Sequence, residues 1–415
     1  MATLDPKAVL DNRRSGRPSI GLIIGVAVCS ACAILALLVD VYQGGPVPTI
    51  IGLFLAVLPV PLLIAGVLFL DRLEPEPRRT IVFAFLWGAG VAALLALVIN
   101  TAGLAFLTVP LFGPQAGYYV SATFGAPLVE ETLKGLVLIG ILWFSRQELD
   151  GPTDGVIYAA MVGLGFALTE NVTYYVRALE SGTLVMTFVM RGLISPLAHP
   201  LFTAMIGLGV AYAAQRHGPA RFWGPALGWV AACVLHGIWN GSSRWGLAGL
   251  AVAYGLLLLV AIALIVVVVR DRKRIVATIA RFLPQYQPTG LVTPEDVRML
   301  ATLGGRRQAR HWARITGGLR ATQAMSDYQL AATELALMHA RAERGVAESH
   351  WPRRRDQLLA LMNAARTAFL IRRPHPPNPP WAGGGAHSGF IRQGPNPPGP
   401  GPYQGHPPQG PGPRY

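Results

Sequence analysis

The sequence predicts an all-α fold: a polytopic bundle of about eight transmembrane helices, then a helical cytoplasmic region and a disordered tail rich in proline and glycine. Three observations predict it. Of the 415 residues, 52% are hydrophobic and only 13% are charged, which is about half the charged fraction of an average soluble domain. Eight apolar runs are about 20 residues or longer, the length that crosses a bilayer. Basic residues gather in alternate connections between these runs, as they do on the cytoplasmic side of membrane proteins.

The apolar runs divide most of the first two thirds of the chain. They cover residues 20–42, 47–70, 80–107, 121–144, 155–176, 192–214, 222–241 and 247–269. The first follows basic residues, as a signal peptide does, but it is too long for the apolar core of one and no convincing cleavage site follows it. We therefore expect it to remain as a membrane anchor. The sixth is the least regular, because Arg191, Pro196 and Pro200 crowd its start.

The distribution of positive charge predicts the orientation in the membrane. Lysine and arginine occur in the N-terminal segment, in the connections 71–79, 145–154 and 215–221, and directly after the last run, whereas the other connections carry little charge. Both termini should therefore face the cytoplasm, in agreement with an even number of spans. We expect a multi-pass protein of the cell membrane. The 35 basic residues comprise 32 arginines and 3 lysines, a bias that points to a GC-rich bacterial genome.

Four regions follow from this pattern: a basic cytoplasmic N-terminus (1–19), a transmembrane domain (20–270), a basic cytoplasmic helical region (271–373) and a disordered tail (374–415). Residues 270–373 hold 19 basic against 8 acidic residues. Thr293 followed by Pro294 is typical of a helix start, and the segments 323–345 and 351–371 have helical composition. The tail has 14 prolines and 10 glycines in 42 positions, too few apolar residues to form a core.

The basic region permits two interpretations. It can be a solvated segment beside anionic lipid, or a domain that binds a protein partner together with the proline-rich tail. Basic charge alone would also suit nucleic acid, but no recognition motif accompanies it, so no nucleic-acid partner is expected.

Polar residues inside the apolar runs are the strongest functional signal, because ionisable groups in lipid are costly. The fourth run contains Glu130, Glu131 and Lys134, which share one helix face at spacings of three and four. One glutamate with one lysine would suit a packing ion pair. A second glutamate adds a surplus charge or a carboxyl that must hold a proton, and such a group is suited to general acid–base work.

Three further runs carry polar residues of the same kind. Glu170 and Asn171 lie in the fifth run, His199 precedes a proline at the start of the sixth, and His236 and Asn240 share a face of the seventh. Alone, each histidine would be interpreted as a packed core residue. At about 1.5 Å per residue, however, Glu130, Glu170, His199 and His236 all lie roughly 8–13 Å below the outer boundary of the membrane. This agreement in depth favours one site in the outer half of the bilayer.

The order of these motifs resembles the PrsW family of intramembrane proteases, which is related to the prenyl-protein endopeptidase and bacteriocin-immunity group. The resemblance covers about residues 45–270 and rests on Glu130-Glu131-x-x-Lys134, Phe166-x-x-x-Glu170-Asn171, His199 and His236-x-x-x-Asn240. Glu170 stands where the prenyl-protein enzymes have histidine, which favours the PrsW branch.

This resemblance implies a membrane-embedded endopeptidase that starts regulated proteolysis of a single-pass signalling regulator, such as an anti-sigma factor, near the outer face of the membrane. Family members are usually described as metalloproteases. A glutamate-activated water without metal is the alternative for the prenyl-protein relatives. The expected cofactor is therefore a divalent metal, zinc first, with the metal-free mechanism left open.

Amide hydrolysis needs an activated water, a stabilised carbonyl oxygen and a proton for the leaving amine. Glu130 or Glu131 is the candidate general base, and Lys134 would orient or tune the pair. His199 and His236 would bind a metal or polarise the carbonyl.

The remaining polar residues complete the predicted site. Asn240 is a candidate oxyanion donor, and Glu170 is a third metal ligand or a second base. Two histidines and one glutamate would match a catalytic zinc site. Phe166 and Asn171 are expected to adjoin it.

Two other functions are compatible with the same residues. Intramembrane glutamate and histidine chains also form the proton relays of transporters and channels, although the repeats common in transporters do not occur here. A non-catalytic scaffold that recruits partners through its tail is the third possibility.

Overall fold

The computed structural model describes residue 6 and residues 20–70, 75–345 and 351–370. Within these ranges the backbone forms helices joined by turns and contains no strand, which confirms the predicted all-α fold. The basic N-terminus predicted at 1–19, except residue 6, and the disordered tail predicted at 374–415 lie outside the described residues.

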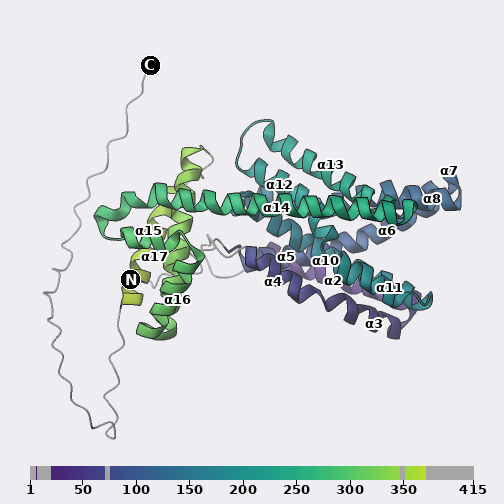
Figure 1. Ribbon diagram of the computed structural model, residues 1–415, viewed down its shortest axis with the longest axis horizontal. Helices are drawn as coiled ribbons and strands as arrows, with labels where there is room; N and C mark the ends of the chain where they lie inside the picture. The colour runs from purple at the N-terminus through teal and green to yellow at the C-terminus, as the bar shows by residue number, and fades with distance from the viewer. Residues whose placement is uncertain (1–5, 7–19, 71–74, 346–350, 371–415) are drawn as a thin grey trace, which may run out of the picture. The chain divides into compact units, whose positions relative to one another are not determined.

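The helices of the apolar part follow one another with short connections (Figure 1). They are α2 (Ile20–Gly44), α3 (Pro46–Val57), α4 (Val60–Leu70), α5 (Arg78–Trp87), α6 (Ala93–Gly103), α7 (Val109–Phe112), α8 (Pro114–Val120), α9 (Ala126–Phe144), α10 (Pro152–Glu180), α11 (Leu184–Phe188), α12 (Ala198–Ala214), α13 (Ala220–Gly241) and α14 (Gly246–Phe282). Short π-helical segments join several of them: η1 (Gly88–Ala92), η2 (Leu104–Thr108), η3 (Ser121–Gly125) and η5 (Val189–Ile194).

Six helical stretches among the described residues are long and apolar enough to cross a membrane. The last of them, Arg221–Thr289, contains both α13 and α14. Helix α9 is not among the six and carries three charged residues, Glu130, Glu131 and Lys134. The chain is thus a multi-pass membrane protein, and the number of eight spans stays a prediction.

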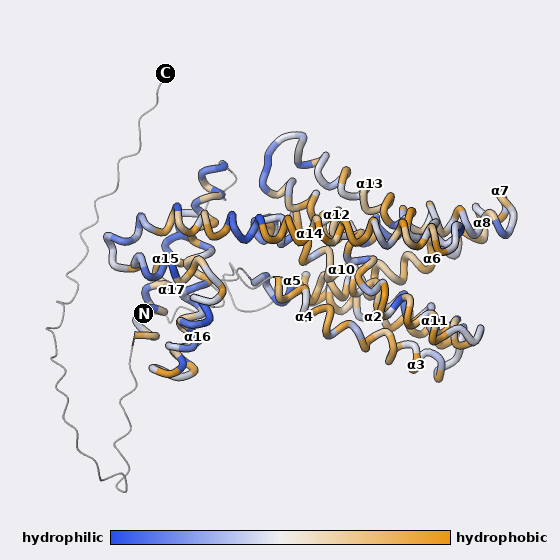
Figure 2. The backbone as a smooth tube through the Cα atoms, viewed as in Figure 1, coloured by the Kyte–Doolittle hydropathy of each residue, from blue (hydrophilic) through white to orange (hydrophobic). Residues whose placement is uncertain are grey.

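Apolar side chains cover much of the outer surface of these helices (Figure 2). Phe106 and Phe144 expose 84% and 87% of their area. Such exposure would be costly in water but suits contact with lipid chains.

The connections predicted to share the cytoplasmic side lie together. Arg272 donates to the carbonyl of Leu70 at the end of α4 (2.9 Å), Arg274 to the carbonyl of Asp150 (2.7 Å), and Arg344 to Gln215 (2.7 Å). Which side of the membrane this end faces stays a prediction.

Helix α10 lies at the centre of the bundle, and 89% of its most apolar window is buried. Glycines make this possible. A Cβ atom at Gly155 would lie 2.1 Å from the carbonyl oxygen of Gly207 in α12, and one at Gly165 would lie 2.0 Å from that of Phe85 in α5. Backbones can approach this closely only where side chains are absent. A Cβ atom at Gly163 would likewise lie 2.6 Å from the backbone nitrogen of Pro200, so the middle of α10 lies against the start of α12, next to His199.

The helical region after the membrane has a core of its own. Helix α14 continues past the predicted end of the last span to Phe282, and Figure 2 shows polar residues along it after the long apolar stretch. The helices α15 (Pro294–Leu300), α16 (Leu303–Glu343) and α17 (Trp351–Leu370) follow. Leu300, Tyr328, Leu335 and Leu358 are fully buried in this core.

The predicted helix start at Thr293 is confirmed. The Thr293 hydroxyl accepts a hydrogen bond from the backbone N–H of Asp296 (3.2 Å), whose carboxylate accepts from the N–H of Thr293 (2.8 Å). Each thus satisfies an otherwise free donor at the helix start.

Candidate active site

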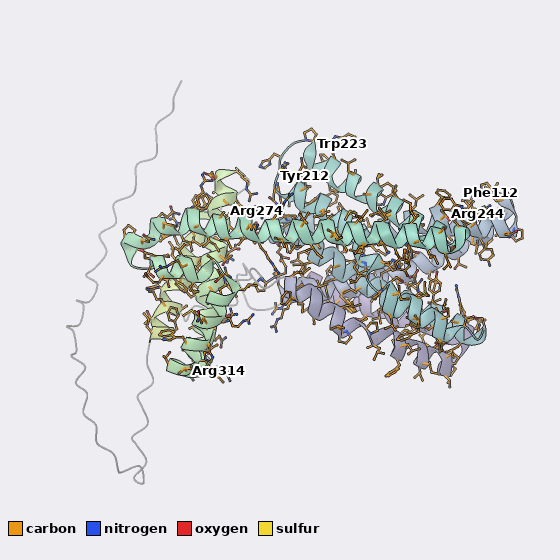
Figure 3. All side chains as sticks on the ribbon, viewed as in Figure 1. Phe112, Tyr212, Trp223, Arg244, Arg274 and Arg314 are labelled. Atoms are coloured by element: carbon orange, nitrogen blue, oxygen red, sulfur yellow. The ribbon has the colours of Figure 1, made fainter. Side chains whose placement is uncertain are left out.

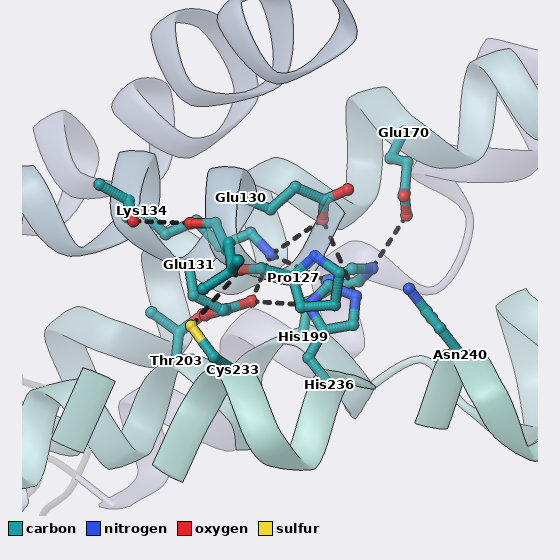
Figure 4. A network of polar contacts seen from close by, with 12 residues as sticks. Pro127, Glu130, Glu131, Lys134, Glu170, His199, Thr203, Cys233, His236 and Asn240 are labelled. Atoms are coloured by element: carbon teal, nitrogen blue, oxygen red, sulfur yellow. Dashed lines mark hydrogen bonds and ion pairs between the residues drawn. The ribbon is translucent and has the colours of Figure 1, made fainter. Parts of the chain in front are cut away.

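Side chains from four helices meet in the apolar part of the bundle (Figure 4). Glu130, Glu131 and Lys134 come from α9, and Phe166, Glu170 and Asn171 from α10. His199 comes from the start of α12 and His236 from the last turns of α13. Nearly all the predicted site residues are therefore close to one another.

Glu131 is the best-held member of the cluster. It is fully buried. One carboxylate oxygen, Oε1, accepts from Lys134 Nζ (2.8 Å) and His236 Nδ1 (3.0 Å), and the other, Oε2, accepts from the Thr203 hydroxyl (3.0 Å). Three donors around one carboxylate favour its ionised form and fix its orientation.

Glu130 lies beside Glu131 but has longer contacts. Its Oε1 accepts from the side-chain amide of Asn100 in α6 (3.2 Å), while its Oε2 lies 3.5 Å from Lys134 Nζ and 3.9 Å from His236 Nε2. The carboxylate thus retains lone pairs for a further partner such as a water molecule.

His199 is bound through both ring nitrogens. Its Nδ1 lies 3.0 Å from Lys134 Nζ, and its Nε2 lies 2.9 Å from Glu170 Oε2. If Lys134 is protonated, its ammonium can only donate, so Nδ1 is the acceptor and Nε2 carries the proton. This arrangement favours a neutral imidazole that donates to Glu170.

Phe166 forms an apolar wall of the site. Lys134 Nζ lies 3.8 Å from the centre of its ring, and its ring centre is 5.2 Å from that of His199. A lysine ammonium over an aromatic face gains cation–π attraction, so Phe166 helps to hold the buried charge of Lys134.

Arg191 was not among the predicted site residues, although it holds two that were. It lies in η5, just before α12, and its guanidinium forms an ion pair with Glu170 and donates to the Asn171 Oδ1 (2.7 Å). It also lies over the ring of Tyr174 (3.7 Å). The sequence signal was an arginine at membrane depth, close before a proline and a histidine.

Two other contacting residues were missed for a simpler reason. Asn100 is the single amide residue of the apolar run 80–107, and Thr203 follows His199 by four residues on one face of α12. Both are small polar groups without charge, and such residues are common inside membrane helices as packing contacts.

Asn240 is positioned differently from the prediction. Its side-chain amide donates to the carbonyl of Ala122 in η3 (2.9 Å). This bond links α13 to η3 and uses one of the two N–H donors of the amide that was expected to stabilise an oxyanion.

A small cavity opens beside His199, with a volume of about 20 Å³. This is enough for about one water molecule. Its lining is formed by Ala167, Asn171, Arg191, Ser195, Pro196, Ala198, His199 and Trp239. Most of these side chains are polar or adjoin the η5–α12 bend, so a polar group of a substrate would find donors there.

Three residues offer a set of metal-binding atoms. Glu130, His199 and His236 each have a ligand atom within 4.8 Å of the others, and one oxygen with two imidazole nitrogens suits zinc. The donor chemistry fits, but Lys134 contacts two of the three, so its positive charge would compete with a metal ion. Glu170 lies outside this set of three and is bound by Arg191 and His199.

The fold and site together define a class: a helical membrane protein with glutamates, histidines and a lysine converging inside the bundle. Residues 76–269 match the family model described as PrsW family intramembrane metalloprotease. Over this segment, somewhat less than half of its length, the chain is similar to the PrsW family.

Curated relatives show the same similarity. The chain is 29% identical to Protease PrsW of Geobacillus kaustophilus over 185 residues, which cover 42% of this chain and 74% of the relative. It is 32% identical to Protease PrsW of Clostridioides difficile over 158 residues (37% and 62%) and 28% identical to that of Bacillus subtilis over 124 residues (30% and 54%). Against these last two, the match spans less than two thirds of the relative. No solved structure matches the chain.

Proposed function

We propose that this chain is an intramembrane endopeptidase that hydrolyses peptide bonds of membrane proteins, with Glu130 as the general base. The observation that carries the proposal is the contrast between the two glutamates. Glu131 is bound by three donors at 3.0 Å or less, whereas Glu130 has only longer contacts and open lone pairs. A base must be free to take a proton from water, and Glu130 meets that condition.

The chain's residues support the following sequence. Glu130 takes a proton from a bound water as the water oxygen attacks the carbonyl carbon of the substrate. When the C–N bond breaks, the leaving amine nitrogen receives that proton from Glu130, so that a carboxylic acid and an amine are released. His236 Nε2 lies 3.9 Å from Glu130 and can relay the proton from Glu130 to the leaving amine. Glu131 accepts a hydrogen bond from His236 Nδ1–H. This fixes the tautomer in which His236 Nε2 carries no proton and can accept one from Glu130.

The developing negative charge on the carbonyl oxygen needs donors. Arg191 and Asn171 line the cavity beside His199. The Asn171 oxygen accepts from Arg191, so its amide N–H groups can face a substrate. We assign the oxyanion to this cavity. Asn240 remains an alternative donor through its second amide N–H, because only one is used by the bond to the carbonyl of Ala122.

The proposed reaction can run with or without a bound metal ion. If zinc binds, Glu130, His199 and His236 would hold it, and it would supply carbonyl polarisation and a more acidic water. In the metal-free branch, the Lys134 ammonium supplies the positive charge among the same groups. Purified protein that cleaves substrate while containing far less than one metal ion per chain would refute the zinc branch.

The proposed substrate is a single-pass membrane protein, such as a signalling regulator of the anti-sigma-factor kind, cut near the outer face. The position of Glu170 along α10 supports a cut near the outer face. Glu170 lies 18 residues from the start of α10 at Pro152 and 10 from its end at Glu180, or about 27 Å and 15 Å along the helix. The Pro152 end adjoins the helical region predicted to be cytoplasmic, since Thr153 donates to Asp271 (2.6 Å).

A comparison of membrane-proteome N-termini tests the function. Cells expressing the wild type are compared with cells expressing Glu130→Gln at equal levels, with and without envelope stress. The matched control is Glu180→Gln, which changes an exposed carboxylate on α10. New termini at the outer face of single-pass proteins, lost only in Glu130→Gln, would support the proposal and identify the substrate. Identical termini in all three strains would refute it.

A further inference from the structure

The corner of α16 has a surface that the proposed activity does not use. At Gly318 the backbone leaves the helical region (φ 74°, ψ −157°), so that two helices meet there at an angle. Trp312, Ile315 and Leu319 flank the break and are 43%, 71% and 71% exposed. Leu370, at the end of α17, is 54% exposed. We refer to these four residues as the α16 corner.

The corner is apolar on a helix whose opposite face is already buried. Ala313 is fully buried, and the Trp312 and Phe369 rings are nearly perpendicular (78°), with ring centres 6.5 Å apart. The internal core is thus complete without Ile315 and Leu319. Exposed apolar side chains grouped in this way commonly mark an interaction surface.

The charged residues around the α16 corner are all basic. Arg307, Arg314 and Arg320 are exposed, and residues 303–326 contain no aspartate or glutamate. Figure 3 shows Arg314 at the lower edge of the helical region, close to the break in α16. An occupant of this surface should therefore be negatively charged. The chain's own tail does not meet this requirement, because residues 371–415 include arginines but no acidic residue.

The helical region is also held close to the membrane. Helix α14 runs without a break from Gly246 to Phe282, so only 12 residues follow Arg270, about 18 Å of helix. A second attachment joins Arg341 of α16 to Asp150 (3.2 Å) in the connection before α10. A basic and apolar surface kept this near a bilayer meets anionic lipid at high local concentration.

We propose that the α16 corner binds the anionic lipid surface of the membrane that the chain spans. Trp312, Ile315 and Leu319 would enter the headgroup region, and Arg314 and Arg320 would contact lipid phosphates. This inference does not depend on peptidase activity. An acidic protein partner would require the same charge, but exposed apolar side chains flanked by arginines this close to the bilayer suit the lipid interface better.

The full-length protein in lipid nanodiscs tests the proposal. A nitroxide on Ile315→Cys, with Cys32 and Cys233 replaced by serine, reports its exposure to oxygen, which concentrates in lipid, and to a water-soluble nickel chelate. Discs of phosphatidylcholine alone are compared with discs that also contain phosphatidylglycerol. The control label is at the exposed Gln357 of α17.

A several-fold loss of nickel access at position 315, only in the anionic discs and reversed by high salt, is the expected result. The Arg314→Gln, Arg320→Gln double variant should abolish this loss with unchanged helix content. Equal nickel access in both kinds of disc would overturn the proposal. So would shielding that appears only after cytosolic proteins are added, which would indicate a protein partner.

Discussion

Glutamine substitutions at Glu130 and Glu131 should have separable effects on stability and activity. Both remove one carboxylate of nearly identical shape from the same turn of α9. Glu131 is fully buried with three donors at 2.8–3.0 Å, and its loss leaves the Lys134 ammonium without its closest acceptor. Breaking a buried ion pair costs about 3–5 kcal/mol, so we expect Glu131→Gln to destabilise the protein by roughly that amount.

Glu130→Gln should behave differently. The amide oxygen can still accept from Asn100, and the contact that is lost, at 3.5 Å from Lys134, is long. We expect a change of about 1 kcal/mol or less together with loss of cleavage, because glutamine cannot take a proton from water.

Unfolding in detergent can be followed with a thiol-reactive dye after Cys32 and Cys233 are replaced by serine, because the remaining Cys29 is buried in the folded state. Peptide cleavage is measured on the same preparations. Equal melting of the two variants, or a Glu130→Gln protein that still cleaves, would refute the assignment of Glu130 as base and Glu131 as its support.

Three further predictions follow from other parts of the structure. Arg191→Met should reduce cleavage strongly and lower the free energy of unfolding by about 3 kcal/mol, because Glu170 would lose its cation. Compared with Arg191→Met, Arg191→Lys should recover more of the stability than of the cleavage rate, since a lysine cannot bind Glu170 and Asn171 together as a guanidinium does. Gly165→Ala should destabilise by about 1–3 kcal/mol, because the new Cβ would lie 2.0 Å from the backbone of Phe85. Burial raises the pKa of Asp150 to about 6, so the folded state binds this proton more tightly than the unfolded chain. Stability should therefore fall by about 3 kcal/mol between pH 4 and pH 6, and Asp150→Asn should reduce that slope in thermal melts.

Each of these has a result that would contradict it. Cleavage by Arg191→Met at the wild-type rate would show that Arg191 has no role in the reaction. A Gly165→Ala protein as stable as the wild type would mean that α5 and α10 can separate at little cost. A pH slope in Asp150→Asn that equals that of the wild type would contradict the assignment to Asp150.

Much of the candidate site could be predicted from the sequence because its members are anomalous in lipid. Glu130, Glu131, Lys134 and Glu170 are ionisable residues inside apolar runs, and such residues are rare enough to be informative one by one. The depth argument brought them to one level, and the structure places them in one network. Asn100 and Thr203 could not be distinguished in this way, since an isolated amide or hydroxyl in a membrane helix is common.

The roles within the site depended on contacts that no spacing specifies. Glu130 and Glu131 are adjacent in sequence and equivalent in composition. They differ only because Thr203 and His236 reach one of them from other helices. Arg191 looked like the edge of a span, and its bonds to Glu170 and Asn171 depend on how η5 folds back beside α10.

The sequence by itself determined the membrane class, the helical fold and the identity of most polar residues of the site, because hydropathy and charge act locally along the chain. The tertiary structure decided which carboxylate is anchored, which amide is already bonded, and which arginine closes the site. Those outcomes depend on distances between helices, and these are set by close backbone contacts such as Gly155 with Gly207. A hydrogen bond requires two groups within about 3 Å, and only the packed bundle brings them that close.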